Sequence, residues 1–118
     1  MRTKFIDLHC DTLDIIARSN GAVSLRSGDC AISFEKMKQA TAMAQFFAIY
    51  MPPQDWIHNI VPGCTDDEFI DDLYATLCNA IAQHPDDIAW AKNAVDMENN
   101  AKISQRNSCI CRCRMYTK

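Results

Sequence analysis

The chain has 118 residues, of which 48% are hydrophobic and 23% are charged, a make-up typical of one soluble globular domain rather than of a disordered segment. The net charge of -3 offers no basic surface, so nucleic-acid binding is not expected. No run approaches the roughly 18 to 20 apolar residues that a membrane span needs. Charges and a histidine come too early for a signal peptide, so a cytoplasmic location is expected.

The first predicted element is a short β-strand over F-I-D-L-H, residues 5 to 9, followed from Cys10 by a helical turn. His9 and Asp11 stand at the end of this strand. Because successive side chains of a strand point to opposite faces, these two are expected to share a face, with Cα atoms roughly 6.6 to 6.8 Å apart. Imidazole nitrogen and carboxylate oxygen both bind Zn²⁺, so His9 and Asp11 are the candidate metal ligands.

This pair also has simpler explanations. An H-x-D triplet arises often by chance, and Asp11 is equally well placed to cap the helical turn that follows it. Asp7 shares the parity of the pair and is a candidate for orienting His9. His58 in a predicted loop and His84 before a proline are expected to be surface histidines rather than ligands.

Two predicted elements follow a polar loop. Ser33 is placed to cap a short helix over F-E-K-M-K-Q-A. The next run, M-A-Q-F-F-A-I-Y-M, is apolar and aromatic almost without interruption until Pro52 and Pro53 end it. Such a run predicts a strand that is covered on both faces, as in a parallel sheet.

The clearest predicted helix begins at Thr65, which forms a T-x-x-E capping box with Glu68. Its apolar residues recur at helical spacing: Phe69, Ile70, Leu73, Leu77 and Ile81. The helix is expected to end at the His84-Pro85 step. Residues 88 to 91, I-A-W-A, then predict a short strand.

A last helix is predicted after Asn93, its cap, with Val95 and Ala101 on its inner side. Strands and helices therefore alternate, which favours an α/β fold with a parallel sheet. A doubly wound sheet in a chain of this size usually has about four or five strands, whereas only three are predicted here. If the fold is a (β/α)₈ barrel, which typically takes about 250 residues, the chain is its first third or half.

The composition changes abruptly near residue 104. Residues 1–103 contain all 15 acidic residues and 8 of the 12 basic ones, whereas residues 104–118 contain no acidic residue and three of the seven cysteines. The chain is thus divided into a body, 1–103, and an atypical Cys/Arg-rich tail, 104–118. The tail's Cys-x-Cys-x-Cys could bind a soft metal but lacks the C-x-x-C spacing of structural zinc sites. The remaining cysteines are expected to be reduced core residues: Cys10, Cys30, Cys64 and Cys78.

The stretch F-I-D-L-H-C-D-T-L, followed at a distance by A-Q-F-F-A-I-Y-M-P, resembles the opening of the membrane dipeptidase (renal dipeptidase) family, peptidase family M19. In that family the first strand ends in a D-x-H-x-D-like motif, and the second strand is close to G-x-Q-F-W-x-x-Y. The resemblance extends over roughly residues 4 to 103. The order of the predicted elements between the two motifs agrees with it.

The resemblance implies a (β/α)₈ barrel, of which this chain is an incomplete N-terminal portion. It implies two zinc ions that activate water to attack the peptide carbonyl of a dipeptide, with His9 and Asp11 as two ligands of one zinc. No other residue of the family's metal set can be assigned here. In the family a further apolar strand ending in Glu-Gly would follow Ile103, whereas this chain runs into S-Q-R-N-S-C-I-C-R-C-R.

We therefore hypothesise that the tail is out-of-frame translation, produced by a frameshift near codon 104. The other two reading frames downstream should then continue with an apolar strand, Glu-Gly and later histidines. If neither frame does so, the hypothesis is wrong.

Three functions follow from these expectations. The lineage is a zinc-dependent dipeptidase, of which this chain alone is a truncated and inactive fragment. Alternatively, the chain is a non-catalytic half-barrel, an interaction module or a pseudogene-like product, which self-associates through open strand edges and an uncovered surface at Phe46, Phe47, Ile49 and Tyr50. An independent small α/β domain is the third alternative.

Overall fold

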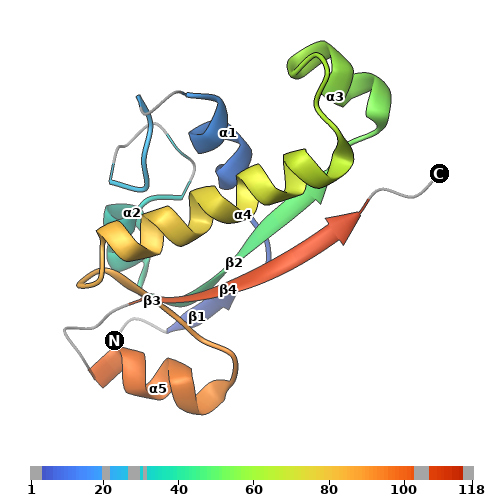
Figure 1. The fold of residues 1–118 in the computed structure, drawn as a ribbon. Coiled ribbons are helices and arrows are strands. Elements are labelled where there is room, and N and C mark those ends of the chain that lie inside the picture. Colours follow the sequence, from blue (N-terminus) through green and yellow to red (C-terminus); the bar gives the residue numbers. More distant parts are fainter. Residues whose placement is uncertain (1–3, 20–21, 27–29, 31, 103–106, 116–118) are drawn as a thin grey trace.

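The computed structural model describes residues 4–19, 22–26, 30, 32–102 and 107–115 (Figure 1). Along the chain the strands are separated by one or two helices, which agrees with the predicted α/β class. In chain order the elements are β1 (Phe5–Asp7), α1 (Thr12–Arg18), α2 (Phe34–Ala40), β2 (Ala42–Met51), α3 (Gln54–Ile60), α4 (Asp66–Gln83), β3 (Ile88–Trp90), α5 (Ala94–Lys102) and β4 (Asn107–Met115).

The strands form one parallel sheet in the order β1-β2-β4-β3. The longest pairing joins β2 to β4, with Ala44 opposite Ser108 and Met51 opposite Met115. The short strands β1 and β3 flank this pair near its beginning. The sequence predicts only three strands, and this is wrong, because the segment 107–115 of the tail forms a strand in the interior of the sheet.

Helices cover the sheet unequally (Figure 1). Helices α1, α2 and α4 lie on one side of β2, whereas α5 lies on the other side, near the start of β4. The main core forms between α4 and the sheet, where Leu73, Leu77 and Phe47 are at most 1% exposed. None of the described helices is long and apolar enough to cross a membrane.

The long apolar run 42–51 forms β2, as predicted, and most of it is buried. Phe47 and Ile49 are 0% and 2% exposed, so they belong to the core rather than to the uncovered surface that the sequence suggests. Tyr50 is 37% exposed and Phe46 is half-buried. Of the four residues expected at an uncovered apolar surface, Tyr50 is exposed and Phe46 is partly exposed.

The predicted caps at Thr65 and Ser33 are confirmed. The Thr65 hydroxyl accepts a hydrogen bond from the Glu68 backbone N–H at 3.2 Å, and Glu68 Oε2 accepts from the Thr65 N–H at 3.5 Å. The Ser33 hydroxyl similarly accepts from the Lys36 N–H at 3.3 Å. Each bond satisfies a backbone donor that the first helical turn leaves without an intrahelical partner.

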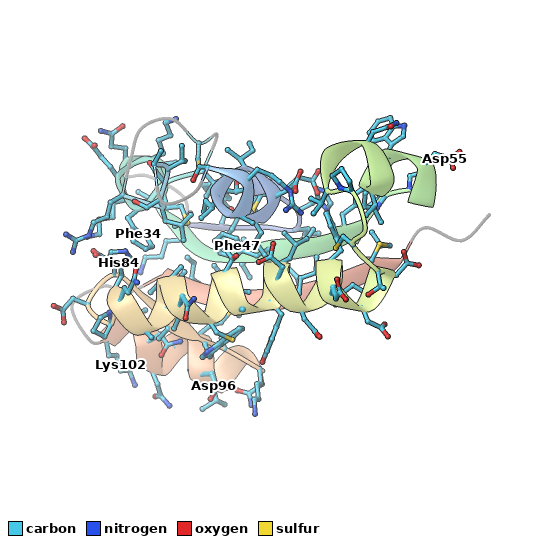
Figure 2. All side chains as sticks on the ribbon, turned by 45° about the horizontal axis from the view of Figure 1, so that its top comes forward. Phe34, Phe47, Asp55, His84, Asp96 and Lys102 are labelled. Carbon is cyan, nitrogen blue, oxygen red and sulfur yellow. The ribbon has the colours of Figure 1, made fainter. Side chains whose placement is uncertain are left out.

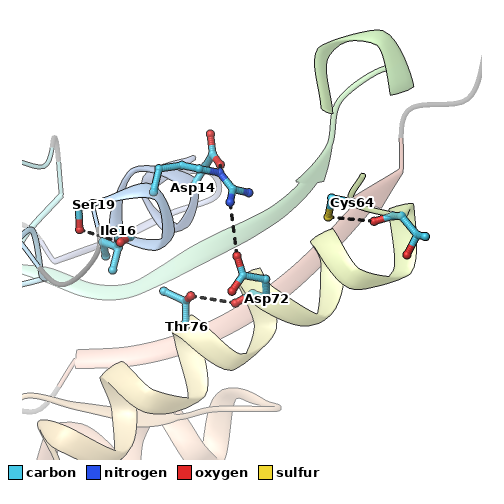
Figure 3. Close-up of polar contacts among 8 residues, drawn as sticks. Asp14, Ile16, Ser19, Cys64, Asp72 and Thr76 are labelled. Carbon is cyan, nitrogen blue, oxygen red and sulfur yellow. Dashed lines mark hydrogen bonds and ion pairs between the residues drawn. The ribbon is translucent and has the colours of Figure 1, made fainter. Parts of the chain in front are cut away.

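A polar contact, which Figure 3 shows, and an aromatic contact join α1 to α4. Arg18 pairs with Asp14 of its own helix at 3.2 Å and with Asp72 of α4 at 3.5 Å. Its guanidinium also lies 4.7 Å from the centre of the Phe69 ring. Because Phe69 is buried, this arginine fixes α1 against the same face of α4 that packs on the sheet.

Two details of the helices differ from the sequence analysis. Residues 54–60 form α3, so His58 belongs to a helix rather than to a loop. In α5, Val95 is 62% exposed, whereas the buried residue is Asn100, whose side chain donates to the Trp90 carbonyl at 3.0 Å. The predicted cap is confirmed, since the Asn93 side chain accepts from the Asp96 N–H at 2.8 Å.

The sequence places His84 at the surface, and the structure shows it only partly exposed. Its ring meets the Phe34 ring edge-on, with the centroids 5.1 Å apart (Figure 2). Its Nδ1 is buried and has no hydrogen-bond partner among the described residues. Burial lowers the pKa of His84 below its ordinary value of 6.5; the Arg26 cation lowers this pKa further, and Asp87 opposes the shift.

This environment predicts a loss of stability in acid. The unfolded chain takes up a proton near pH 6.5, whereas folded His84 resists protonation. The contribution is therefore fully present above that pH and is lost as the pH falls through the lower pKa of the folded state. Urea unfolding between pH 8 and 5 should show a shallower decline for His84→Leu than for the wild type; equal slopes would contradict the assignment.

Candidate metal centre

His9 and Asp11 lie just beyond the carboxyl end of β1, in the connection to α1. The strand ends at Asp7, two residues earlier than the sequence predicts. Between the two candidate ligands, the Cys10 carbonyl accepts a hydrogen bond from the Ala48 N–H of β2 at 3.0 Å. This bond holds the connection against the central strand.

The side chain of Cys10, between the two candidate ligands, is buried. The Cys10 side chain is 8% exposed and belongs to the core. His9 and Asp11 stand on either side of this inward side chain, in the connection that follows the strand. His9 and Asp11 reach solvent, with 47% and 63% of their side chains exposed.

The two outward side chains contact each other directly. His9 Nε2 lies 3.0 Å from Asp11 Oδ2. In this contact Nε2 donates to the Asp11 carboxylate in the tautomer that carries the proton on Nε2. Two ligands on a tetrahedral zinc, with bonds of about 2.0 to 2.1 Å, stand about 3.3 Å apart. The 3.0 Å between His9 Nε2 and Asp11 Oδ2 is therefore close to the spacing that two ligands of one Zn²⁺ would need.

The alternative role of Asp11 as a helix cap is not realised by its side chain. Asp11 occupies the position before α1 but makes no side-chain capping hydrogen bond. Asp7 meets His9 through the backbone instead of the imidazole, since Asp7 Oδ1 accepts the His9 N–H at 3.4 Å. Asp7 therefore helps to position the connection, and it does not fix the ring of His9.

Within the described part of the chain, no group of three or more histidine, cysteine, aspartate or glutamate residues is placed to hold a metal ion. Cys10 is close in sequence, but burial raises the pKa of its thiol, with Asp7 and Asp11 adding to the shift and hydrogen bonds with Thr12 opposing it. It is a protonated core residue. The sequence thus identified both members of the pair, and the described residues add no third.

The other candidates of the sequence analysis lie apart from this pair. Of the Cys-x-Cys-x-Cys run, Cys109 is 0% exposed and packs in the core, and the side chains of the other two lie outside the described structure. Cys30 is buried, whereas Cys64 and Cys78 are partly exposed. The expectation of core cysteines is therefore confirmed for Cys10 and Cys30 only.

Comparison with known proteins gives a likeness in structure alone. No protein-family model and no curated protein matches the sequence. Among solved structures, the crystal structure of dipeptidase AC, a metallopeptidase of family M19, is similar to this chain with a TM-score of 0.73 and 15% sequence identity. The match covers 97% of this chain and 36% of that protein, so the chain spans about a third of its structural neighbour.

Asp11 should contribute less to stability than the capping residues of α2 and α4, because its side chain makes no capping hydrogen bond. Replacing Thr65 or Ser33 by alanine should lower the free energy of unfolding by about 1 kcal/mol, because each hydroxyl satisfies a helix N–H. Asp11→Ala should lower the free energy of unfolding by only a few tenths of the cost at Thr65 or Ser33, because this change removes one exposed contact with His9. Urea unfolding at neutral pH measures all three variants, and a cost at Asp11 equal to that at Thr65 would make Asp11 a structural residue.

Proposed function

We propose that this chain is the N-terminal portion of a zinc-dependent dipeptidase barrel, and that His9 and Asp11 are two of its metal ligands. The observation that supports this most is the 3.0 Å contact between His9 and Asp11 at the end of the first parallel strand. The likeness to dipeptidase AC supports the same fold.

The position of the pair suits such a role. Active sites of (β/α)₈ barrels lie at the carboxyl ends of the parallel strands, where connections from several strands meet. His9 and Asp11 follow β1 at that end, and β1 runs parallel to β2 beside it. Their exposed side chains leave the site open to water and to a peptide.

The pair provides part of a catalytic centre. When bound, zinc supplies Lewis acidity for the attack of water on a peptide carbonyl, and catalytic zinc normally takes three protein ligands. His9 would offer Nε2 and Asp11 a carboxylate oxygen, and the described residues place no third ligand beside them. We therefore propose a dipeptide as the substrate of the family's complete site, and no turnover by this chain alone.

A non-catalytic interaction module is the second candidate function. It is favoured by three exposed apolar side chains on and beside β1, namely Phe5 at 42%, Ile6 at 40% and Leu8 at 61% exposure. β1 stands at an edge of the sheet, and exposed apolar edges favour association with other chains.

The frameshift origin of residues 104–118 likewise stays a proposal, because the pairing of β4 concerns how the segment folds and not how it is encoded.

Zinc titration followed by NMR tests the metal site. The His9 imidazole signals should shift on addition of Zn²⁺, and His9→Gln or Asp11→Asn should weaken binding at this site at least tenfold. Partners that only support a metal ligand are worth about 10- to 100-fold in affinity, so a direct ligand should be worth no less. Asp14→Asn is a matched control, because Asp14 is a nearby carboxylate that pairs with Arg18 instead.

The same protein should hydrolyse no dipeptide detectably. If Zn²⁺ shifts only the cysteine signals and leaves those of His9 unchanged, the proposed site is wrong. Robust turnover that a chelator abolishes would contradict the incomplete centre.

A further inference from the structure

The central strand β4 has an open edge over most of its length. β3 pairs with β4 only from Asn107 to Cys109, whereas β2 pairs with it as far as Met115. Figure 1 shows β2 and β4 continuing together well beyond β3. From Ile110 to Met115, no described strand therefore pairs with the edge of β4 that faces away from β2.

One hydrogen bond shows which backbone groups face this edge. The Cys109 carbonyl accepts from the Ala91 N–H at 2.9 Å, so the backbone groups of Cys109 point towards β3. Along a strand the N–H and C=O of one residue point to the same side, and successive residues alternate. The backbone groups of Cys111, Cys113 and Met115 thus face the open edge.

Aromatic surface flanks the place where this edge opens. Trp90, opposite Cys109 in the last β3–β4 pair, is 38% exposed. Its ring centre lies 6.4 Å from that of Tyr74 in α4, which is 50% exposed. An incoming strand would therefore meet apolar surface as well as backbone donors and acceptors, the two components of strand addition.

We propose that the occupant of this edge is β4 of a second copy of the chain, paired antiparallel across a two-fold axis. The edge matches itself, because a two-fold axis reverses β4 and brings outward N–H groups opposite outward C=O groups of the same strand. The result is one continuous sheet through two copies. This interface goes beyond the proposed zinc site and does not depend on it.

The direction of the backbone groups fixes the register. Opposed residues of an antiparallel pair must both point their N–H and C=O at the partner, or both point them away. A two-fold axis at Cys113 satisfies this and uses every outward residue, with Cys111 of each copy opposite Met115 of the other. An axis at Arg112 leaves Met115 unpaired.

The same register brings Arg112 opposite the second copy's Arg114. Like charges directly opposite each other destabilise a strand pair, and salt screens exposed charges. The dimer should therefore tighten as the salt concentration rises, whereas an interface held by ion pairs would weaken.

Cross-linking of the wild-type protein tests the register. In a hydrogen-bonded antiparallel pair the Cα atoms are about 5.5 Å apart, which lies within the range that a disulfide spans. Mild oxidation with diamide should give a dimer joined through Cys113 of both copies, located by peptide mass spectrometry. Cys111→Ser should still cross-link and Cys113→Ser should not. A cross-link through other cysteines, or none, would overturn the register.

Sedimentation equilibrium with EDTA present tests the dimer without zinc. Cys113→Pro removes an N–H from the open edge and none from the β2 pairing, so it should weaken association roughly tenfold or more, since each copy loses a hydrogen bond. Cys113→Ala, the matched control, should dimerise like the wild type. A wild-type monomer at every concentration and salt, or a proline variant that dimerises normally, would overturn the proposal. If Cys113→Pro does not fold, as judged by circular dichroism, the wild-type sedimentation and cross-linking decide.

Discussion

The parallel pairing of β2 with β4 is the contact on which the rest of this fold depends. It joins Ala44–Met51 to Ser108–Met115, eight residue pairs in unbroken register. The pairing presents Phe47 and Ile49 to the core beneath α4, and β1 and β3 each have a central strand to pair with. Without β4, β2 would have an open edge and β3 would have no partner among the described strands.

The candidate metal site is a consequence of the same sheet. β2 holds the Cys10 carbonyl through Ala48, and the core takes up the Cys10 side chain. Residues 9 and 11 are left outward on a backbone that is fixed between them. The backbone between the two candidate ligands is therefore held by packing that involves neither of their side chains, which remain exposed.

The elements that sequence analysis predicts correctly are those with strong local signals. The helix α4 combines a capping box with an apolar stripe, and β2 is apolar over its whole length. The strand β4 is not predicted, because its composition, rich in cysteine and arginine, indicates a break from the body of the protein. Yet Cys109, Cys111 and Cys113 recur with the period of two that a strand requires. That alternation was the available signal.

Other errors came from contacts distant in sequence. The partial burial of His84 involves Phe34 of α2, fifty positions earlier, a contact that no local pattern reports. The exposure of Val95 and burial of Asn100 are set by how α5 meets the end of β3. In the candidate site, the types of His9 and Asp11 were evident from the sequence, whereas their direct contact depends on Cys10 and β2. The end of β1 at Asp7 was not evident from the sequence either.

Amide hydrogen exchange over residues 107–115 tests the central pairing most directly. The N–H groups of Ile110, Arg112 and Arg114 face β2, because they alternate with Cys109, which faces β3. These three amides should exchange slowly, like those of β2 itself. Exchange of all three at the rate of an unfolded chain, while β2 and α4 stay protected, would show that β4 is not part of the sheet and would contradict the account.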